Sequence, residues 1–249
     1  MLFSPENHEP LSDEPWDEER LRAGIRDIVA DAEAAFEPVG LWPAEEEWDA
    51  RRARLPLTHL YGGAAGVVWA LDVLRRRGHA EVGLDLGAAV RRSLEKWATE
   101  PDAPERREPP VASHAGLYFG ESGILLVAFR VAPSGELADR LHSRVRENWD
   151  CETNELMTGS PGTLLAAKAM LDWTGEERWA AAWRASADEL WRRRYWDGFW
   201  TYPPYGKAPA PRTGSARIRT SCSRAASSSR PTAASGFQAR RRKLLPASP

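Results

Sequence analysis

The chain has 249 residues, of which 42% are hydrophobic, and its formal net charge is −2. No apolar run reaches the roughly 18 residues of a membrane span, and the first ten residues lack the basic start and apolar stretch of a secretory signal. The two cysteines, Cys151 and Cys222, form neither a disulfide framework nor a paired metal spacing. We therefore expect one or two globular domains in a reduced, cytoplasmic protein without a membrane partner.

Apolar residues recur at helical spacing along most of the chain. Residues 1–16 are polar and aperiodic and predict a flexible arm, and an amphipathic helix is predicted over 17–36. A second helix is predicted after Gly66, ending at Arg77, and a third over 87–98. The same pattern predicts four more helices: from about 121 to 132, over 136–149, from 163 to 174, and over 176–195. No stretch alternates with the period of two that strands require.

A short motif precedes three of these helices. It is a Gly-x-x-Gly turn followed at once by an apolar segment rich in small residues, and its clearest copy is N-E-L-M-T-G-S-P-G-T-L-L-A-A-K-A-M-L at 154–171. The paired glycines of the three copies are Gly63 and Gly66, Gly120 and Gly123, and Gly159 and Gly162. Three copies of one motif indicate a structural repeat.

The repeat alternates two kinds of helix. Short apolar helices that follow the glycine turns alternate with longer helices that are charged on one side. A helix that is apolar nearly all round lies inside a fold, and one with a single apolar stripe lies outside it. We therefore predict an all-α fold, a partial α/α toroid of helical hairpins over 17–207, with the glycine turns at one shared end where a site would lie.

The composition changes after Lys207. Residues 206–249 contain ten Lys or Arg and no acidic residue, whereas the remaining 24 basic and 36 acidic residues give a net charge of −12. Residues 208–249 have no hydrophobic periodicity and predict a disordered basic tail. No aromatic residues interleave the charges, so we do not expect a nucleic-acid partner.

A second interpretation of the tail is an out-of-frame translation. With GC-rich codons assumed from Pro211 onward, reading from the last base of the first codon yields A-H-G-L-G-A-H-P-D-V-V-L-A. That would be a fourth glycine turn and apolar helix at the place where the alternation requires them. We hypothesise a frameshift or a sequencing error, which sequencing of the gene through this region decides.

With these repeats, the chain resembles the lanthionine synthetase C-like (LanC-like) family. The resemblance is carried by 60–71, 116–129 and 154–179, and it extends over roughly 17–207. It implies an α/α toroid. The best-known members of the family are zinc enzymes that add a cysteine thiol to a dehydrated Ser or Thr and so close a thioether ring in a peptide. The zinc lowers the thiol pKa, and an acid protonates the enolate.

The chain departs from the family's metal pattern. Members hold zinc with a Cys and a later Cys-His pair, and this sequence has no Cys-His pair. It ends about where a fourth repeat would begin, so we expect no zinc in this chain, although a complete member would carry it, and no cyclase activity. Glu155 is the one acid that the resemblance places a few residues before the third turn.

Several residues keep two interpretations each. Glu155 is either an acid at the toroid mouth or a carboxylate that stabilises the following helix. His114 either lines the mouth or forms a hydrogen bond to a loop. Cys151 is a solitary thiol or a zinc ligand. The tryptophans near the end of the helical region, among them Trp191 and Trp200, serve either helix packing or a stacking surface.

Three functions remain open. The first is a LanC-like protein related to peptide thioether cyclases, acting on a peptide or on a small thiol or electrophile. The second is a non-catalytic peptide-binding scaffold, and the third an α/α-toroid glycosidase that uses two carboxylates among Glu121, Asp150 and Glu155, with aromatic residues near 197–200. An incomplete toroid would also expose apolar helix sides, so we expect self-association through its open edge.

Overall fold

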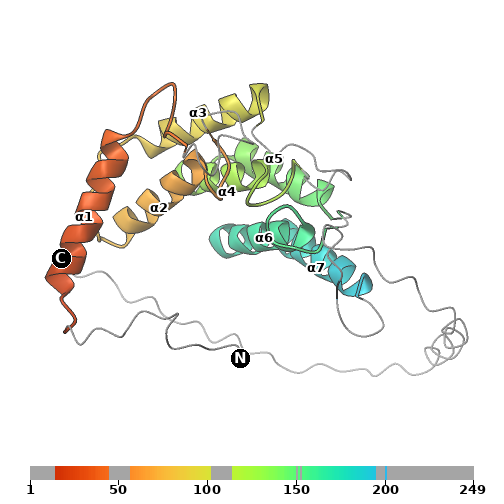
Figure 1. Cartoon of the computed structure of the whole chain (residues 1–249). Helices are drawn as coiled ribbons and strands as arrows, with labels where there is room; N and C mark the ends of the chain where they lie inside the picture. The colour runs from red at the N-terminus through yellow and green to blue at the C-terminus, as the bar shows by residue number, and fades with distance from the viewer. Residues whose placement is uncertain are drawn as a thin grey trace, which may run out of the picture. The chain divides into compact units, whose positions relative to one another are not determined.

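A computed structural model describes residues 15–44, 57–101, 114–149, 151, 153–194 and 200. These residues form seven α-helices and no β-strand (Figure 1). The helices are α1 (Glu18–Ala34), α2 (Ala64–Arg76), α3 (Leu86–Thr99), α4 (Glu121–Val131), α5 (Gly135–Glu147), α6 (Ser160–Thr174) and α7 (Glu177–Arg192). The predicted all-α class is confirmed for this part of the chain.

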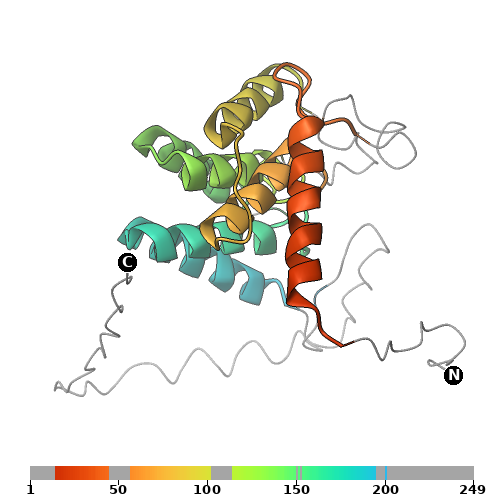
Figure 2. The same cartoon turned by 90° about the vertical axis from the view of Figure 1, so that its left-hand side faces the viewer.

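Helices α2 to α7 pack in chain order. Each contacts the next, and additional contacts join α2 to α4, α4 to α6 and α5 to α7. Helix α4 lies at the centre of these contacts, and the eight residues from Glu121 to Ala128 are all buried. Helix α1 lies beside α2 in both views (Figures 1 and 2). The core is therefore built mainly around α4 and its neighbours.

Helices α1 to α6 begin in two different ways, whereas α7 follows Glu176 and has no side-chain cap. Helices α1, α3 and α5 each have a side-chain cap, in which Asp17, Asp85 or Ser134 accepts a hydrogen bond from a backbone N–H of the first turn. Helices α2, α4 and α6 instead begin directly after a glycine that has no side chain to offer. This difference follows the alternation of helix types in the sequence.

The apolar stripe of α1 is only partly covered. Val29 is the buried residue of this helix, while Leu21 and Ile28 are 46% and 65% exposed. Helix α2 is apolar on two sides, and Ala64, Ala65, Val68 and Leu71 face the core. The apolar face that the sequence indicates for this helix, formed by Val67, Ala70, Leu71 and Leu74, borders a cavity beside α1, and Leu71 is at the same time buried in the core.

Some sequence-based predictions lie outside the described residues. These are the arm at 1–14, the tail at 208–249, Asp150, Cys222 and the aromatic segment 195–199. Among the residues that the structure does describe, no helix combines the length and the apolar character needed to cross a membrane.

Candidate functional site at the glycine turns

The three turns are built alike. Gly63, Gly120 and Gly159 are the N-cap residues of α2, α4 and α6, and all three have extended backbone conformations. Their conformation does not require glycine, but the space around them does. A Cβ atom would lie 2.7 Å from the His59 carbonyl oxygen at Gly63, 2.5 Å from that of Gly116 at Gly120, and 2.1 Å from that of Thr153 at Gly159.

The second glycine of each turn makes an equally close contact. A Cβ atom at Gly66, Gly123 or Gly162 would lie 2.4, 2.1 or 2.2 Å from the carbonyl oxygen of the leucine six residues earlier. Those leucines are Leu60, Leu117 and Leu156. Both glycines of each pair are therefore required because the turn folds tightly back on the start of its helix.

The turns also contact one another in chain order, the first with the second and the second with the third. The backbone N–H of Tyr61 donates to the Tyr118 carbonyl oxygen at 3.0 Å, and the N–H of Tyr118 donates to the Met157 carbonyl oxygen at 3.0 Å. The N–H of Phe119 donates to the same Met157 oxygen at 3.2 Å. The structure thus brings three segments that are far apart in the chain to one end of α2, α4 and α6.

An aromatic cluster lies where the first two turns meet. The ring of Phe119 lies 5.0 Å from His59 and 5.1 Å from Tyr61, and Tyr61 lies 6.5 Å from Tyr118. Nδ1 of the buried His59 accepts the Gly62 N–H at 3.2 Å, which fixes the imidazole in the turn. Tyr61 is 64% exposed. The turn end therefore presents an aromatic face held by a buried histidine.

Glu155 lies within the third turn, and its carboxylate is bound there. The carboxylate accepts hydrogen bonds from the N–H of Met157 at 2.5 Å, the N–H of Thr158 at 2.8 Å and the Thr158 hydroxyl at 2.6 Å. Both oxygens hold the turn in shape before α6 begins. These contacts favour the structural interpretation of Glu155, and its role as an acid remains a proposal.

His114 lies at the start of the second turn, beside α3. Its side chain is exposed and its ring lies 6.1 Å from that of Trp97 on α3, while its carbonyl oxygen accepts the Glu121 N–H at 2.8 Å. No ring contact joins it to the described aromatic cluster of His59, Tyr61 and Phe119. This placement favours the loop role over a place in the mouth.

Glu121 is directed at α5 rather than at Glu155. Its buried carboxylate binds Arg140 at 2.6 Å and Arg144 at 2.5 Å. Burial alone would lower the pKa of Arg144, but hydrogen bonds to Glu147 and Glu121 outweigh it and hold this pKa above its usual value. Glu121 thus anchors α4 to α5, and its contacts do not support a carboxylate pair for glycoside hydrolysis.

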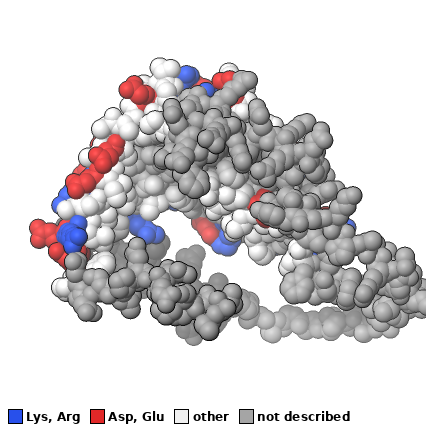
Figure 3. Space-filling view, viewed as in Figure 1, with Lys and Arg blue, Asp and Glu red and all other residues white. Residues whose placement is uncertain are grey.

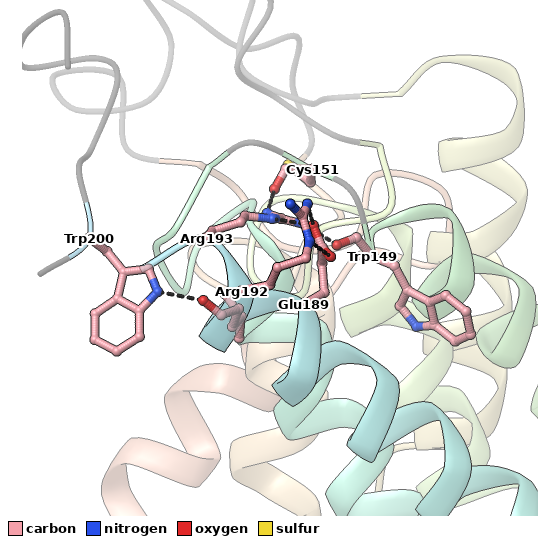
Figure 4. Close-up of polar contacts among 7 residues, drawn as sticks. Trp149, Cys151, Glu189, Arg192, Arg193 and Trp200 are labelled. Atoms are coloured by element: carbon pink, nitrogen blue, oxygen red, sulfur yellow. Dashed lines mark hydrogen bonds and ion pairs between the residues drawn. The ribbon is translucent and has the colours of Figure 1, made fainter. Parts of the chain in front are cut away.

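Cys151 lies in a loop that Arg193 holds against α7 (Figure 4). The Arg193 guanidinium donates to the carbonyl oxygens of Trp149 and Cys151 and, at 2.8 Å, to the Glu189 carboxylate. Hydrogen bonds from Arg192 and Arg193 lower the pKa of Glu189 to about 2. The Cys151 thiol is free and half-buried, and no three His, Cys, Asp or Glu side chains among the described residues gather as metal ligands.

The described tryptophans of the C-terminal region divide into packing and exposed groups. Trp179 is fully buried, whereas Trp191 is 61% exposed and lies 6.4 Å from Trp200. The Trp200 indole N–H donates to the Leu190 carbonyl oxygen at 2.7 Å, and Arg194 lies 4.0 Å from the Trp191 ring centroid. This exposed pair is separate from the aromatic cluster at the glycine turns.

An apolar cavity of about 690 Å³ adjoins the turns. Its walls come from α1, α2, α4 and α6 and from the first two turns, and they include Ile28, Gly66, Ala70, Leu126 and Leu165. Figure 3 shows mostly uncharged residues along the hollow between α1 and α6. The cavity therefore suits an apolar occupant rather than an ionic one.

The sequence reasoning missed His59, Tyr61 and Phe119. An alignment of the three turns would have found His59, because His59 and Glu155 occupy the same position four residues before the first glycine, where the second turn has Gly116. A side chain at Gly116 is excluded, since a Cβ atom there would lie 2.7 Å from the Thr158 Cα. Comparisons of the chain with protein-family models, curated proteins and solved structures found no match.

Proposed function

We propose that this chain is a LanC-like protein of the α/α-toroid type and that its glycine-turn end binds a peptide. The proposal rests on the repeated turns and on the pairing of helices from α2 to α7 in chain order. In such a toroid, α2, α4 and α6 are the inner helices and α3, α5 and α7 the outer ones. The turns then form part of one mouth.

One observation carries the binding role. Tyr61 is 64% exposed, yet its ring is held against Phe119 and Tyr118 at the junction of two turns. A fixed and exposed aromatic ring loses little conformational entropy on binding, and it offers both an apolar face and a hydroxyl group. This combination suits a peptide, which presents apolar side chains and backbone polar groups together.

We propose binding without ring closure by this chain. The sequence has no Cys-His pair of the family's zinc-binding kind. The carboxylate of Glu155, the one acid that the resemblance places near the mouth, is bound to the turn at Met157 and Thr158. A peptide that enters the mouth would therefore be held but left unmodified.

The test uses a synthetic peptide that contains one cysteine and one dehydroalanine. Binding is measured by calorimetry, and ring closure by alkylation with N-ethylmaleimide followed by mass spectrometry, since closure consumes the thiol without changing the peptide mass. We expect binding of this peptide and full alkylation after incubation, with or without added zinc. Absence of binding would contradict the binding role, and loss of alkylation would contradict binding without ring closure.

A further inference from the structure

The contact between neighbouring turns has a direction. The leucine of each turn packs on the second glycine of the next turn: the Leu60 Cβ lies 2.7 Å from where a Cβ on Gly123 would be, and the Leu117 Cβ lies 3.0 Å from that point on Gly162. We call the leucine the knob and the second glycine the seat. Two copies of one contact within a single chain define how a further turn would be added.

Among the residues that the structure describes, one knob remains without a seat at one end of the row. The third turn carries the knob Leu156, which is 47% exposed, although the corresponding Leu117 is buried and Leu60 is half-buried in the core. A large apolar side chain in this position gains free energy when it is removed from water.

A seat remains unused at the other end. Gly66 in the first turn has only backbone atoms of its own turn, from Leu60 and Tyr61, within 4 Å of its would-be Cβ among the described residues. Gly66 also lines the apolar cavity together with Gly62 and Gly63. The open seat therefore faces a space in which a leucine side chain fits.

We propose that Leu156 of a second copy of this chain enters this space and packs on Gly66, and that Leu156 of the first copy packs on Gly66 of the second. A knob needs the second glycine of a Gly-x-x-Gly turn, and Gly66 is such a glycine. The two glycines of the tail, Gly214 and Gly236, do not have this spacing. The tail therefore does not offer a seat of this kind, whereas a second copy does.

Two such contacts close the assembly. Each copy contributes three turn-started helices, so a two-fold dimer contains six of them in a ring and leaves neither a knob nor a seat unused. Apolar surface on the cavity wall supports the closure, because Ala70 is exposed, Val67 is half-buried and Leu165 is 43% exposed. Contiguous apolar surface of this kind marks an association face.

The test measures the mass of the purified chain by sedimentation equilibrium. We expect twice the 27.8 kDa of one chain. Leu156→Ser removes both knobs from the dimer, so the dissociation constant should rise about 100-fold. Ala70→Glu places a charge on the wall beside the seat and should have a similar effect. Val39→Ser changes a 73% exposed residue outside the cavity and should leave the mass unchanged.

A mixture of the two disruptive variants tests the pairing itself. The Ala70→Glu copy keeps its knob and the Leu156→Ser copy keeps its seat, so the mixture retains one intact contact and should associate more strongly than either variant alone. Circular dichroism checks that both variants keep their helices. A monomeric wild-type chain, an open-ended polymer, or a Leu156→Ser protein as dimeric as the wild type would overturn the proposal.

Discussion

The Cβ atom of Leu60 lies 2.7 Å from the point that a Cβ atom on Gly123 would occupy, although 63 positions separate the two residues in the sequence. The same glycine would meet the Leu117 carbonyl oxygen at 2.1 Å. A Cβ atom on Gly123 would therefore clash with both its own turn and the preceding turn. This contact places the first two turns side by side.

Replacement of Gly123 by alanine should therefore destabilise the fold. The methyl group has no space and must displace backbone, for which we expect a loss of about 3 kcal/mol. For a chain of this size, that is a fall in melting temperature on the order of 10 °C, measurable by calorimetry. Gly24→Ala is the matched control. Gly24 lies within α1 with nothing within 4 Å of its would-be Cβ, so this change should stabilise the protein by about 0.5 kcal/mol.

Asp72 is a second point at which distant parts of the chain meet. Its fully buried carboxylate binds Arg75 at 2.9 Å and Arg76 at 2.7 Å within α2, and Arg130 of α4 at 2.7 Å. Asp72→Asn leaves these guanidinium groups without their anion, and we expect a loss of about 3 kcal/mol in denaturant unfolding. Asp172→Asn, which breaks the exposed pair with Lys168, should cost about 0.5 kcal/mol or less.

The contribution of Asp72 to the free energy of unfolding should also depend on pH. Burial raises the pKa of Asp72, but hydrogen bonds from Arg75, Arg130 and Arg76 outweigh burial and lower it overall. The folded state therefore releases this proton more readily than the unfolded state, whose carboxyl pKa is about 3.9. The stabilisation is fully present above about pH 4. It is lost as the pH falls through the lowered value, so the stability difference between wild type and Asp72→Asn should shrink in acid. A constant difference down to pH 2 would contradict this account.

Arg193 should control access to the Cys151 thiol. Its guanidinium holds the carbonyl oxygens of Trp149 and Cys151 against α7 (Figure 4). Arg193→Ala removes these bonds, so the loop opens more often and the alkylation of Cys151 by iodoacetamide should become several-fold faster. Peptide-resolved mass spectrometry separates this cysteine from Cys222. The control is Arg192→Ala, because Arg192 is 72% exposed and contacts Glu189 but neither loop carbonyl. Equal rates in both variants would show that Arg193 does not restrain the loop.

The sequence predicted a helix well where its apolar residues form a single stripe that packs against the core. Val90, Leu94 and Trp97 recur at helical spacing and are buried on α3. The prediction was less complete for helices with two apolar sides. Val67 and Ala70 of α2 border the cavity, whereas Val68 and Leu71 enter the core, and hydropathy alone does not separate the two sides.

Contacts between distant residues could not be predicted from spacing. Asp72 and Arg130 lie 58 residues apart, and each alone is an ordinary charged residue on a helix. The aromatic cluster has the same origin, because Tyr61 and Phe119 meet through the pairing of two turns. Glu155 was recognised from its place before a turn, but the three hydrogen bonds that occupy its carboxylate follow from the backbone path.

The proposed peptide site is tested most directly by a binding titration of Tyr61→Ala. The titration uses the cysteine- and dehydroalanine-containing peptide, with wild type and Trp191→Ala in parallel, because Tyr61 and Trp191 are similarly exposed at 64% and 61% but lie in different clusters. We expect Tyr61→Ala to weaken binding about tenfold and Trp191→Ala to bind as the wild type does. Equal affinity of Tyr61→Ala and wild type, or a loss confined to Trp191→Ala, would contradict a peptide site at the glycine turns.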